Sequence, residues 1–180
     1  MHRRRVLAAI PFLFGGAGCL GGGSCPPFET GADRSVCGRP QRGESIWLNV
    51  SQPTWASSQA ATTGTPNVFT LHNELATTLR VNPHGWTLYE NNSEQWTPIK
   101  QGISDSGEVS LTPGGTYRWS LSRGSTPSPT EHHTEYITAD IDRGRYAFVV
   151  RVADPHTDTS IACLAPFAVV GTGQSTGERS

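Results

Sequence analysis

From residue 46 to residue 170 the chain is a series of short runs in which apolar and polar residues alternate. A period of two is typical of a β-strand that buries one face and exposes the other. Tyr117, Trp119 and Leu121, for example, alternate with polar residues. On this basis the sequence predicts strands over residues 46–50, 67–73, 78–81, 86–90, 95–99, 108–111, 116–121, 135–138, 146–152 and 161–170.

Turn-forming residues separate these runs, and no run is followed by a helical pattern. Asn82-Pro83-His84-Gly85 predicts a turn or bulge, and the polar stretch 51–66 predicts a long loop or a ragged edge. Many short strands without helices predict an all-β fold, in which two antiparallel sheets pack as a sandwich. We expect this domain to cover residues 46–171 and to be followed by a disordered tail over residues 172–180.

One motif indicates the type of sandwich. Residues 142–148 read Asp-Arg-Gly-Arg-Tyr-Ala-Phe. The motif resembles the corner before the penultimate strand of immunoglobulin-like domains, where a tyrosine hydroxyl bonds back to the backbone. The resemblance implies that Asp142, Gly144 and Tyr146 form this structural corner. It also implies that Phe148, which stands where antibody domains carry a disulfide cysteine, packs against Phe69 or Leu71 with Trp86 upon it.

A wider pattern over residues 67–170 points the same way. Gly85-Trp86-Thr87-Leu88-Tyr89 is followed by Trp96, then by Leu111 to Trp119, and then by Gly144-Arg145-Tyr146. This order resembles the immunoglobulin-like domains of prokaryotic surface lipoproteins. The resemblance implies a binding or structural module without catalytic chemistry.

Only one of the 14 basic residues is a lysine, which suggests a GC-rich genome such as that of a haloarchaeon.

The amino terminus has the layout of an export signal. Three arginines at positions 3–5 precede an apolar run over residues 6–14, which is too short to span a bilayer. Gly16-Ala17-Gly18-Cys19 then resembles a lipobox, which implies that residues 1–18 are removed and that Cys19 carries a lipid. The alternative is an ordinary secretory signal with Cys19 unmodified. Residues 19–45 are rich in Gly, Pro and Arg and predict a flexible tether.

These features predict a lipid-anchored protein of the cell membrane that faces the extracellular side. Its partners are then the membrane, through Cys19, and another surface protein or a glycan. Without residues 1–18 the chain has 11 basic and 15 acidic residues, so charge gives no case for nucleic acid. Trp55 lies in the polar stretch 51–66 and is the one tryptophan expected to be exposed, which makes a glycan-binding module through Trp55 a third hypothesis. The other four tryptophans are expected in the core.

The sequence offers two groups of residues as candidates for a metal site. Asp154, His156 and Asp158 stand at alternate positions around Pro155, and His132 and His133 lie in a Pro-flanked loop. Oxygen-rich turns of this kind are usually just hydrated. The sequence therefore predicts no cofactor and no enzyme activity. The alternative function is a secreted metal-binding protein or metal-dependent hydrolase that uses the Asp154, His156 and Asp158 region.

Three cysteines remain after lipidation of Cys19, namely Cys25, Cys37 and Cys163. Export permits a disulfide between two of them, and all three pairings are open. We favour Cys37–Cys163, because this bridge would join the tether to the last strand. Cys25–Cys37, which closes a short loop within the tether, is the main alternative.

Overall fold

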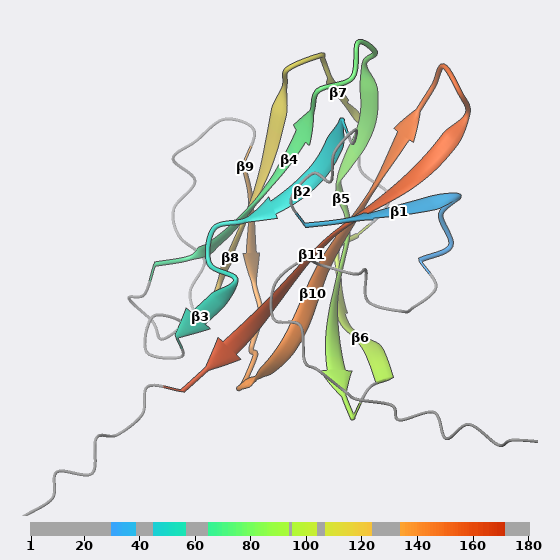
Figure 1. Cartoon of the computed structure of the whole chain (residues 1–180). Coiled ribbons are helices and arrows are strands. Elements are labelled where there is room, and N and C mark those ends of the chain that lie inside the picture. Colours follow the sequence, from blue (N-terminus) through green and yellow to red (C-terminus); the bar gives the residue numbers. More distant parts are fainter. Residues whose placement is uncertain are drawn as a thin grey trace, which may run out of the picture.

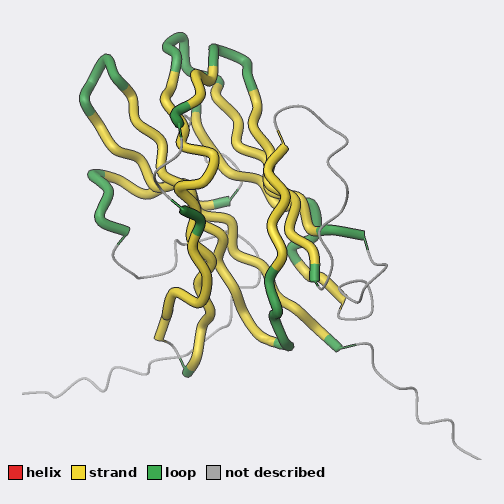
Figure 2. Tube along the Cα trace, turned by 180° about the vertical axis from the view of Figure 1, so that it is seen from behind, coloured by secondary structure: helices red, strands yellow, loops and turns green. Residues whose placement is uncertain are grey.

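The structure, a computed structural model, describes residues 30–38, 45–56, 65–93, 95–103, 107–123 and 134–171. Within these ranges the chain forms strands and no helix (Figures 1 and 2). The strands are β1 (Arg34–Cys37), β2 (Ile46–Val50), β3 (Thr54–Ala56), β4 (Asn67–Asn73), β5 (Leu79–Asn92), β6 (Gln95–Gln101), β7 (Val109–Leu111), β8 (Thr116–Ser122), β9 (Thr134–Thr138), β10 (Gly144–Asp154) and β11 (Thr159–Val170). No helix with the length and apolar character needed to cross a bilayer occurs in the described residues.

The strands form two sheets that pack against each other (Figure 1). The seven-stranded sheet, called sheet A, has the order β1-β11-β10-β5-β6, with β3 paired to β11 and β7 paired to β5. The four-stranded sheet, called sheet B, has the order β2-β4-β8-β9. The predicted all-β sandwich is thus confirmed. It is not purely antiparallel, because β1 and β3 pair in parallel with β11, and β9 pairs in parallel with β8.

The main core lies between the sheets, where alternate residues of each strand meet. Its centre is Phe148 on β10, which stacks on Phe69 of β4 with ring centroids 4.3 Å apart and planes at 22°. The ring of Trp86 lies 5.8 Å from Phe148. The predicted packing of Phe148 against Phe69 or Leu71, with Trp86 upon it, is confirmed for Phe69.

Strand β5 contains the bulge that the sequence predicted over residues 82–85. The register with β10 shifts there, because Val150 pairs with Trp86 whereas Val152 pairs with Val81. The bulge keeps β5 continuous from Leu79 to Asn92, where two separate strands were expected. It also links the two sheets, since the carbonyl of Pro83 accepts a buried hydrogen bond of 2.8 Å from Nε1 of Trp119 on β8.

The prediction of a flexible tether over residues 19–45 is wrong for residues 30–38. Strand β1 pairs with β11 over four positions, from Arg34 opposite Ile161 to Cys37 opposite Leu164. Ahead of it, the backbone N–H of Asp33 donates to the carbonyl of Ser160 at 3.0 Å. The folded domain therefore begins before residue 46, and its first strand joins sheet A.

Candidate functional site

The corner predicted at residues 142–146 is present. The buried Tyr146 hydroxyl donates to the backbone carbonyl of Asp142 at 3.0 Å and lies 3.2 Å from Oε1 of Glu90. Burial, followed by the charge of Glu90, raises the pKa of Tyr146 to about 12. Gly144 leaves room for the ring, because a Cβ at this position would lie 3.2 Å from the Tyr146 hydroxyl oxygen. The role of these residues is structural.

Tyr146→Phe is expected to lower the free energy of unfolding by about 1–2 kcal/mol, because the Asp142 carbonyl and Glu90 lose a buried donor. Arg145→Ala, at the exposed neighbouring position, is expected to change it by less than about 0.5 kcal/mol. Tyr146 favours its neutral form in the fold. Because the pKa of Tyr146 is higher in the folded than in the unfolded state, its contribution to the free energy of unfolding is complete below pH 10. This contribution is lost as the pH rises towards about 12. Thermal unfolding of both variants checks this, and equal melting temperatures would contradict it.

The predicted Cys37–Cys163 disulfide is wrong. Val36, and not Cys37, is the residue of β1 that stands opposite Cys163. An offset of one residue along a strand turns a side chain to the other face of the sheet. Cys163 is accordingly buried as a thiol in the core between the sheets, whereas Cys37 packs in a separate cluster with Leu164. Cys37 is nevertheless disulfide-bonded, so its bond does not involve Cys163.

The metal candidates are not brought together as a ligand set. Oδ1 of Asp154 accepts the backbone N–H of His156 at 3.0 Å, so this carboxylate caps the turn between β10 and β11. His156 and Asp158 are exposed in the same turn. His132 and His133, like Cys19 and Cys25, lie outside the described residues. No group of three or more His, Cys, Asp or Glu side chains suited to a metal ion occurs in the described part of the chain.

Trp55 is not the exposed platform that the sequence suggested. It is 0% exposed, and its indole Nε1–H donates to the carbonyl of Thr65 at 3.3 Å. Strand β3 pairs with the end of β11 and turns Trp55 into the core, where its ring lies 6.5 Å from Phe167. Trp86 and Trp119 are buried as predicted. Trp47 and Trp96, also expected in the core, are only half-buried.

Trp47 belongs to the face of sheet B that points away from sheet A, here called the outer face of sheet B. On β2, the neighbours Ile46 and Leu48 are buried in the core, so Trp47 between them faces outwards. Pairing across the sheet arranges the outward residues in three rows. These rows are Trp47, His72 and Thr116; Asn49, Thr70, Arg118 and Thr134; and Val68, Ser120 and Tyr136.

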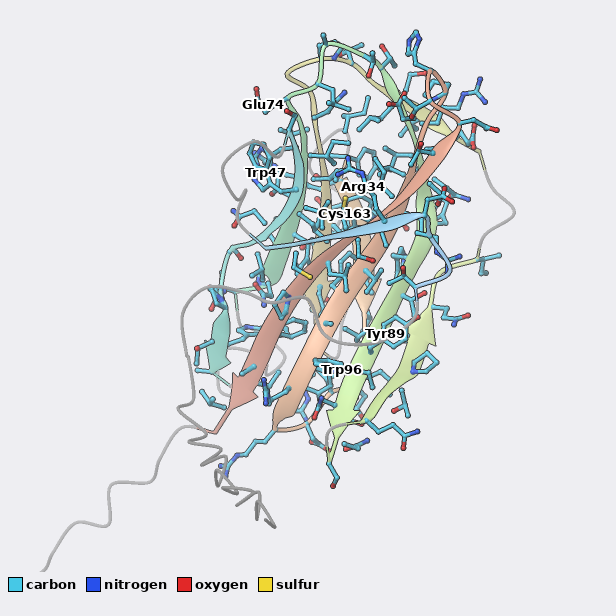
Figure 3. All side chains as sticks on the ribbon, turned by 45° about the vertical axis from the view of Figure 1, so that its right-hand side comes forward. Arg34, Trp47, Glu74, Tyr89, Trp96 and Cys163 are labelled. Atoms are coloured by element: carbon cyan, nitrogen blue, oxygen red, sulfur yellow. The ribbon has the colours of Figure 1, made fainter. Side chains whose placement is uncertain are left out.

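The first row contains a stacked pair of rings. The Trp47 indole and the His72 imidazole have centroids 4.7 Å apart and planes at 10°. Burial lowers the pKa of His72 from 6.5; nearby Glu74 opposes this shift and Arg118 adds to it. The imidazole is therefore neutral at pH 7. The pair is a flat, uncharged aromatic element at the outer side of sheet B, where Figure 3 labels Trp47.

The other rows surround this element with polar groups. Asn49 and Arg118 are exposed, and Thr70 and Thr134 are half-buried beside them. Hydroxyl, amide and guanidinium groups together supply both donors and acceptors of hydrogen bonds. The outer face of sheet B can therefore combine ring stacking with hydrogen bonding, which makes it the candidate binding site. The sequence contained a signal for it, namely the place of Trp47 between the core residues Ile46 and Leu48.

Comparison with known proteins adds little to this picture. No protein-family model matches the chain, and no curated protein matches it. Among solved structures, the X-ray structure of Northeast Structural Genomics Consortium target SoR45 is similar with a TM-score of 0.41 and 10% sequence identity. The similarity covers 76% of this chain and 95% of that chain. At this level it carries no functional inference, so function is argued from the residues themselves.

Proposed function

We propose that the protein is a non-catalytic binding module, held outside the cell membrane by a lipid on Cys19, that binds carbohydrate on the outer face of sheet B. The observation that carries the proposal is the stacked pair of Trp47 and His72 on a face made largely of hydroxyl, amide and guanidinium groups. The tyrosine corner and the two packed sheets support an immunoglobulin-like type for the sandwich.

Carbohydrate is favoured over a protein partner by the chemistry of this face. A sugar ring presents C–H groups that pack on a flat aromatic ring, and its hydroxyls bond to polar side chains around that ring. The fully buried centre of a protein–protein interface is instead more apolar than the rest of the surface, and Lys, Glu, Asp, Ser and Ala are depleted there. Here Thr70 and Thr116 are the direct neighbours of the Trp47 and His72 pair.

The metal-dependent alternative has less support, because the Asp154 carboxylate serves the turn that it caps. Metal analysis of the purified domain tests this alternative. Stoichiometric zinc, copper or calcium would favour it over the binding module.

A glycan array tests the carbohydrate proposal. We expect the labelled chain, starting at residue 19 and carrying Cys19→Ser to keep it soluble, to bind one structural class of oligosaccharide. A screen in which no glycan binds, while a surface protein of the same cell does, would contradict the proposal and assign the face to a protein partner.

Cys19→Ser is expected to abolish lipid attachment and to release the protein from the membrane fraction. Stable anchoring needs two or more lipid chains, and the proposal assigns them all to the Cys19 position. Fractionation of cells followed by immunoblotting measures this. A Cys25→Ser variant is the matched control and should stay in the membrane fraction. A Cys19→Ser protein that is still processed and membrane-bound would rule out the lipid anchor.

A further inference from the structure

The sequence contains two motifs of the type that accepts an N-linked glycan. Asn49-Val50-Ser51 includes the end of β2, and Asn91-Asn92-Ser93 leads from β5 into the turn before β6. The pattern Asn-x-Ser also occurs by chance, and an acceptor normally lies in a surface loop of an exported protein. The structural setting of each motif therefore decides between them.

The Asn91 motif stands at the tip of a hairpin. Strands β5 and β6 pair as far as Asn92 opposite Gln95, and Ser93 begins the connecting turn with a φ of 52°. Asn92 and Ser93 are exposed, and Asn91 is half-buried. Figure 1 shows this hairpin at the lower end of the molecule. An exposed turn of this kind has room for a bulky attached group.

Asn91 belongs to the face of sheet A that points away from sheet B, here called the outer face of sheet A. It pairs with the exposed Arg145 on β10, whereas its neighbour Glu90 pairs with the buried core residue Tyr146. Successive residues of a strand point to opposite faces, so Asn91 and Arg145 are both on the outer face. Nδ2 of Asn92, the middle residue of the motif, donates to Oε2 of Glu90 at 3.0 Å, on the other side of β5.

A tryptophan stands beside Asn91 on the same face. Trp96 of β6 is the cross-strand partner of Asn91 (Figure 3), and directly opposite residues have Cβ atoms about 5 Å apart. The first sugar of a glycan on Asn91 therefore starts next to the Trp96 indole, where its C–H groups can pack on the ring. Arg145, on the other side of Asn91, offers guanidinium donors to sugar hydroxyls.

The Asn49 motif is instead built into sheet B. Asn49 pairs with Thr70 on β4. The Ser51 hydroxyl donates to Oδ1 of Asn67 at 3.1 Å and accepts the backbone N–H of Val68 at 2.9 Å. The backbone N–H of Ser51 also donates to the Val68 carbonyl at 2.8 Å. Both the strand and the acceptor hydroxyl are thus engaged in the fold. A glycan on Asn49 would also cover the proposed binding face of sheet B.

We propose that Asn91 carries an N-linked oligosaccharide and that Asn49 does not, which rests on the proposed function in that the chain must be exported. The side-chain nitrogen of Asn91 attacks the anomeric carbon of a sugar that is joined through phosphate to a membrane lipid. A carbon–nitrogen bond forms, the carbon–oxygen bond to the phosphate breaks, the nitrogen loses a proton and the lipid phosphate leaves. The catalyst is a membrane-bound oligosaccharyltransferase that acts on exported chains.

The place of this glycan fits the rest of the molecule. It is attached to sheet A, so it leaves the outer face of sheet B open for a ligand. Strand β6 stands at the end of the strand order of sheet A, and its Ile99 is 42% exposed. Edge strands with exposed apolar residues tend to pair with other chains. A bulky glycan at the start of β6 shields this edge.

Glycopeptide mass spectrometry of the protein isolated from the membranes of its own cells tests the assignment. Trypsin separates the two motifs, because residues 43–80 contain Asn49 and residues 81–100 contain Asn91. We expect peptide 81–100 to carry the additional mass of an oligosaccharide and peptide 43–80 to have the mass of its unmodified sequence.

The outcomes separate this proposal from the proposed function. An unmodified peptide 81–100 from a processed, membrane-bound chain would overturn the glycan on Asn91 and leave the binding module standing. A glycan on peptide 43–80 would overturn the choice between the motifs. A chain that retains residues 1–18 and has no glycan would overturn both proposals, because it would not be exported.

Variants expressed in the same cells test the role of the motif itself. Asn91→Gln and Ser93→Ala should each lower the mass of the whole chain by the mass of one glycan. Asn92→Gln is the matched control, since it changes the middle residue but keeps the motif, and it should retain the glycan. A chain whose mass falls only by the substitution itself in Asn91→Gln would overturn the proposal.

Discussion

Phe148→Ala is expected to lower the free energy of unfolding by about 3–5 kcal/mol, the cost typical of removing a fully buried aromatic ring. Phe148 is 0% exposed, and its ring stacks on Phe69 of the opposite sheet at 4.3 Å. Trp86 and Trp119 lie 5.8 and 6.0 Å away. Three aromatic rings thus pack around Phe148, and because protein interiors are closely packed we expect the cavity left by alanine to close poorly.

Urea denaturation measures this effect. The midpoint of unfolding should fall, whereas an unchanged slope of the free energy of unfolding against urea concentration would show that the variant unfolds from the same compact state. Val170→Ala is the matched control, because Val170 lies on the neighbouring strand β11 and is 39% exposed. It should change the free energy of unfolding by less than about 0.5 kcal/mol. A loss below about 1 kcal/mol for Phe148→Ala would place the centre of the core elsewhere.

Trp47→Ala is expected to weaken carbohydrate binding at least about tenfold, since one central aromatic residue commonly carries more than 1.4 kcal/mol of a binding energy. The variant removes the ring that stacks on His72 but leaves the rows of polar groups around it. Trp47 packs against the core but is only half-buried and is not one of its fully buried residues, so the fold should be retained.

Trp96→Ala is the control for this experiment. Trp96 is also half-buried, but it lies on β6 of sheet A, away from the proposed site. Calorimetric titration with the best glycan, after melting curves have shown that both variants are folded, compares the two. If the Trp47→Ala and Trp96→Ala variants bound the glycan with equal affinity, the outer face of sheet B would not be the binding site.

The strands that the sequence predicted well are those in which alternation is long enough to decide the buried face. β2 and β4 have the predicted bounds, because Ile46 and Leu48 on one strand and Phe69 and Leu71 on the other alternate with more polar neighbours. β1 and β3 escaped prediction because they have only four and three residues and lie within stretches of mostly polar residues, Gly and Pro. Both exist only through pairing with the distant strand β11.

The same long-range pairing explains the errors at the candidate sites. The polar neighbours of Trp55 suggested exposure, but the parallel pairing of β3 with β11 turns this indole into the core. The Cys37–Cys163 bridge failed on a register that no local pattern reveals, since Val36 stands opposite Cys163. The tyrosine corner was predictable because Asp142, Gly144 and Tyr146 form it within one short stretch.

The most direct test of the binding proposal is a nuclear magnetic resonance titration of the isotope-labelled chain, starting at residue 19 with Cys19→Ser, with the best-binding oligosaccharide. We expect the largest changes at the Trp47 indole, the His72 ring and the backbone amides of β2, β4 and β8. Changes centred on β5, β6 or β10 of sheet A would contradict the assignment of the site to the outer face of sheet B.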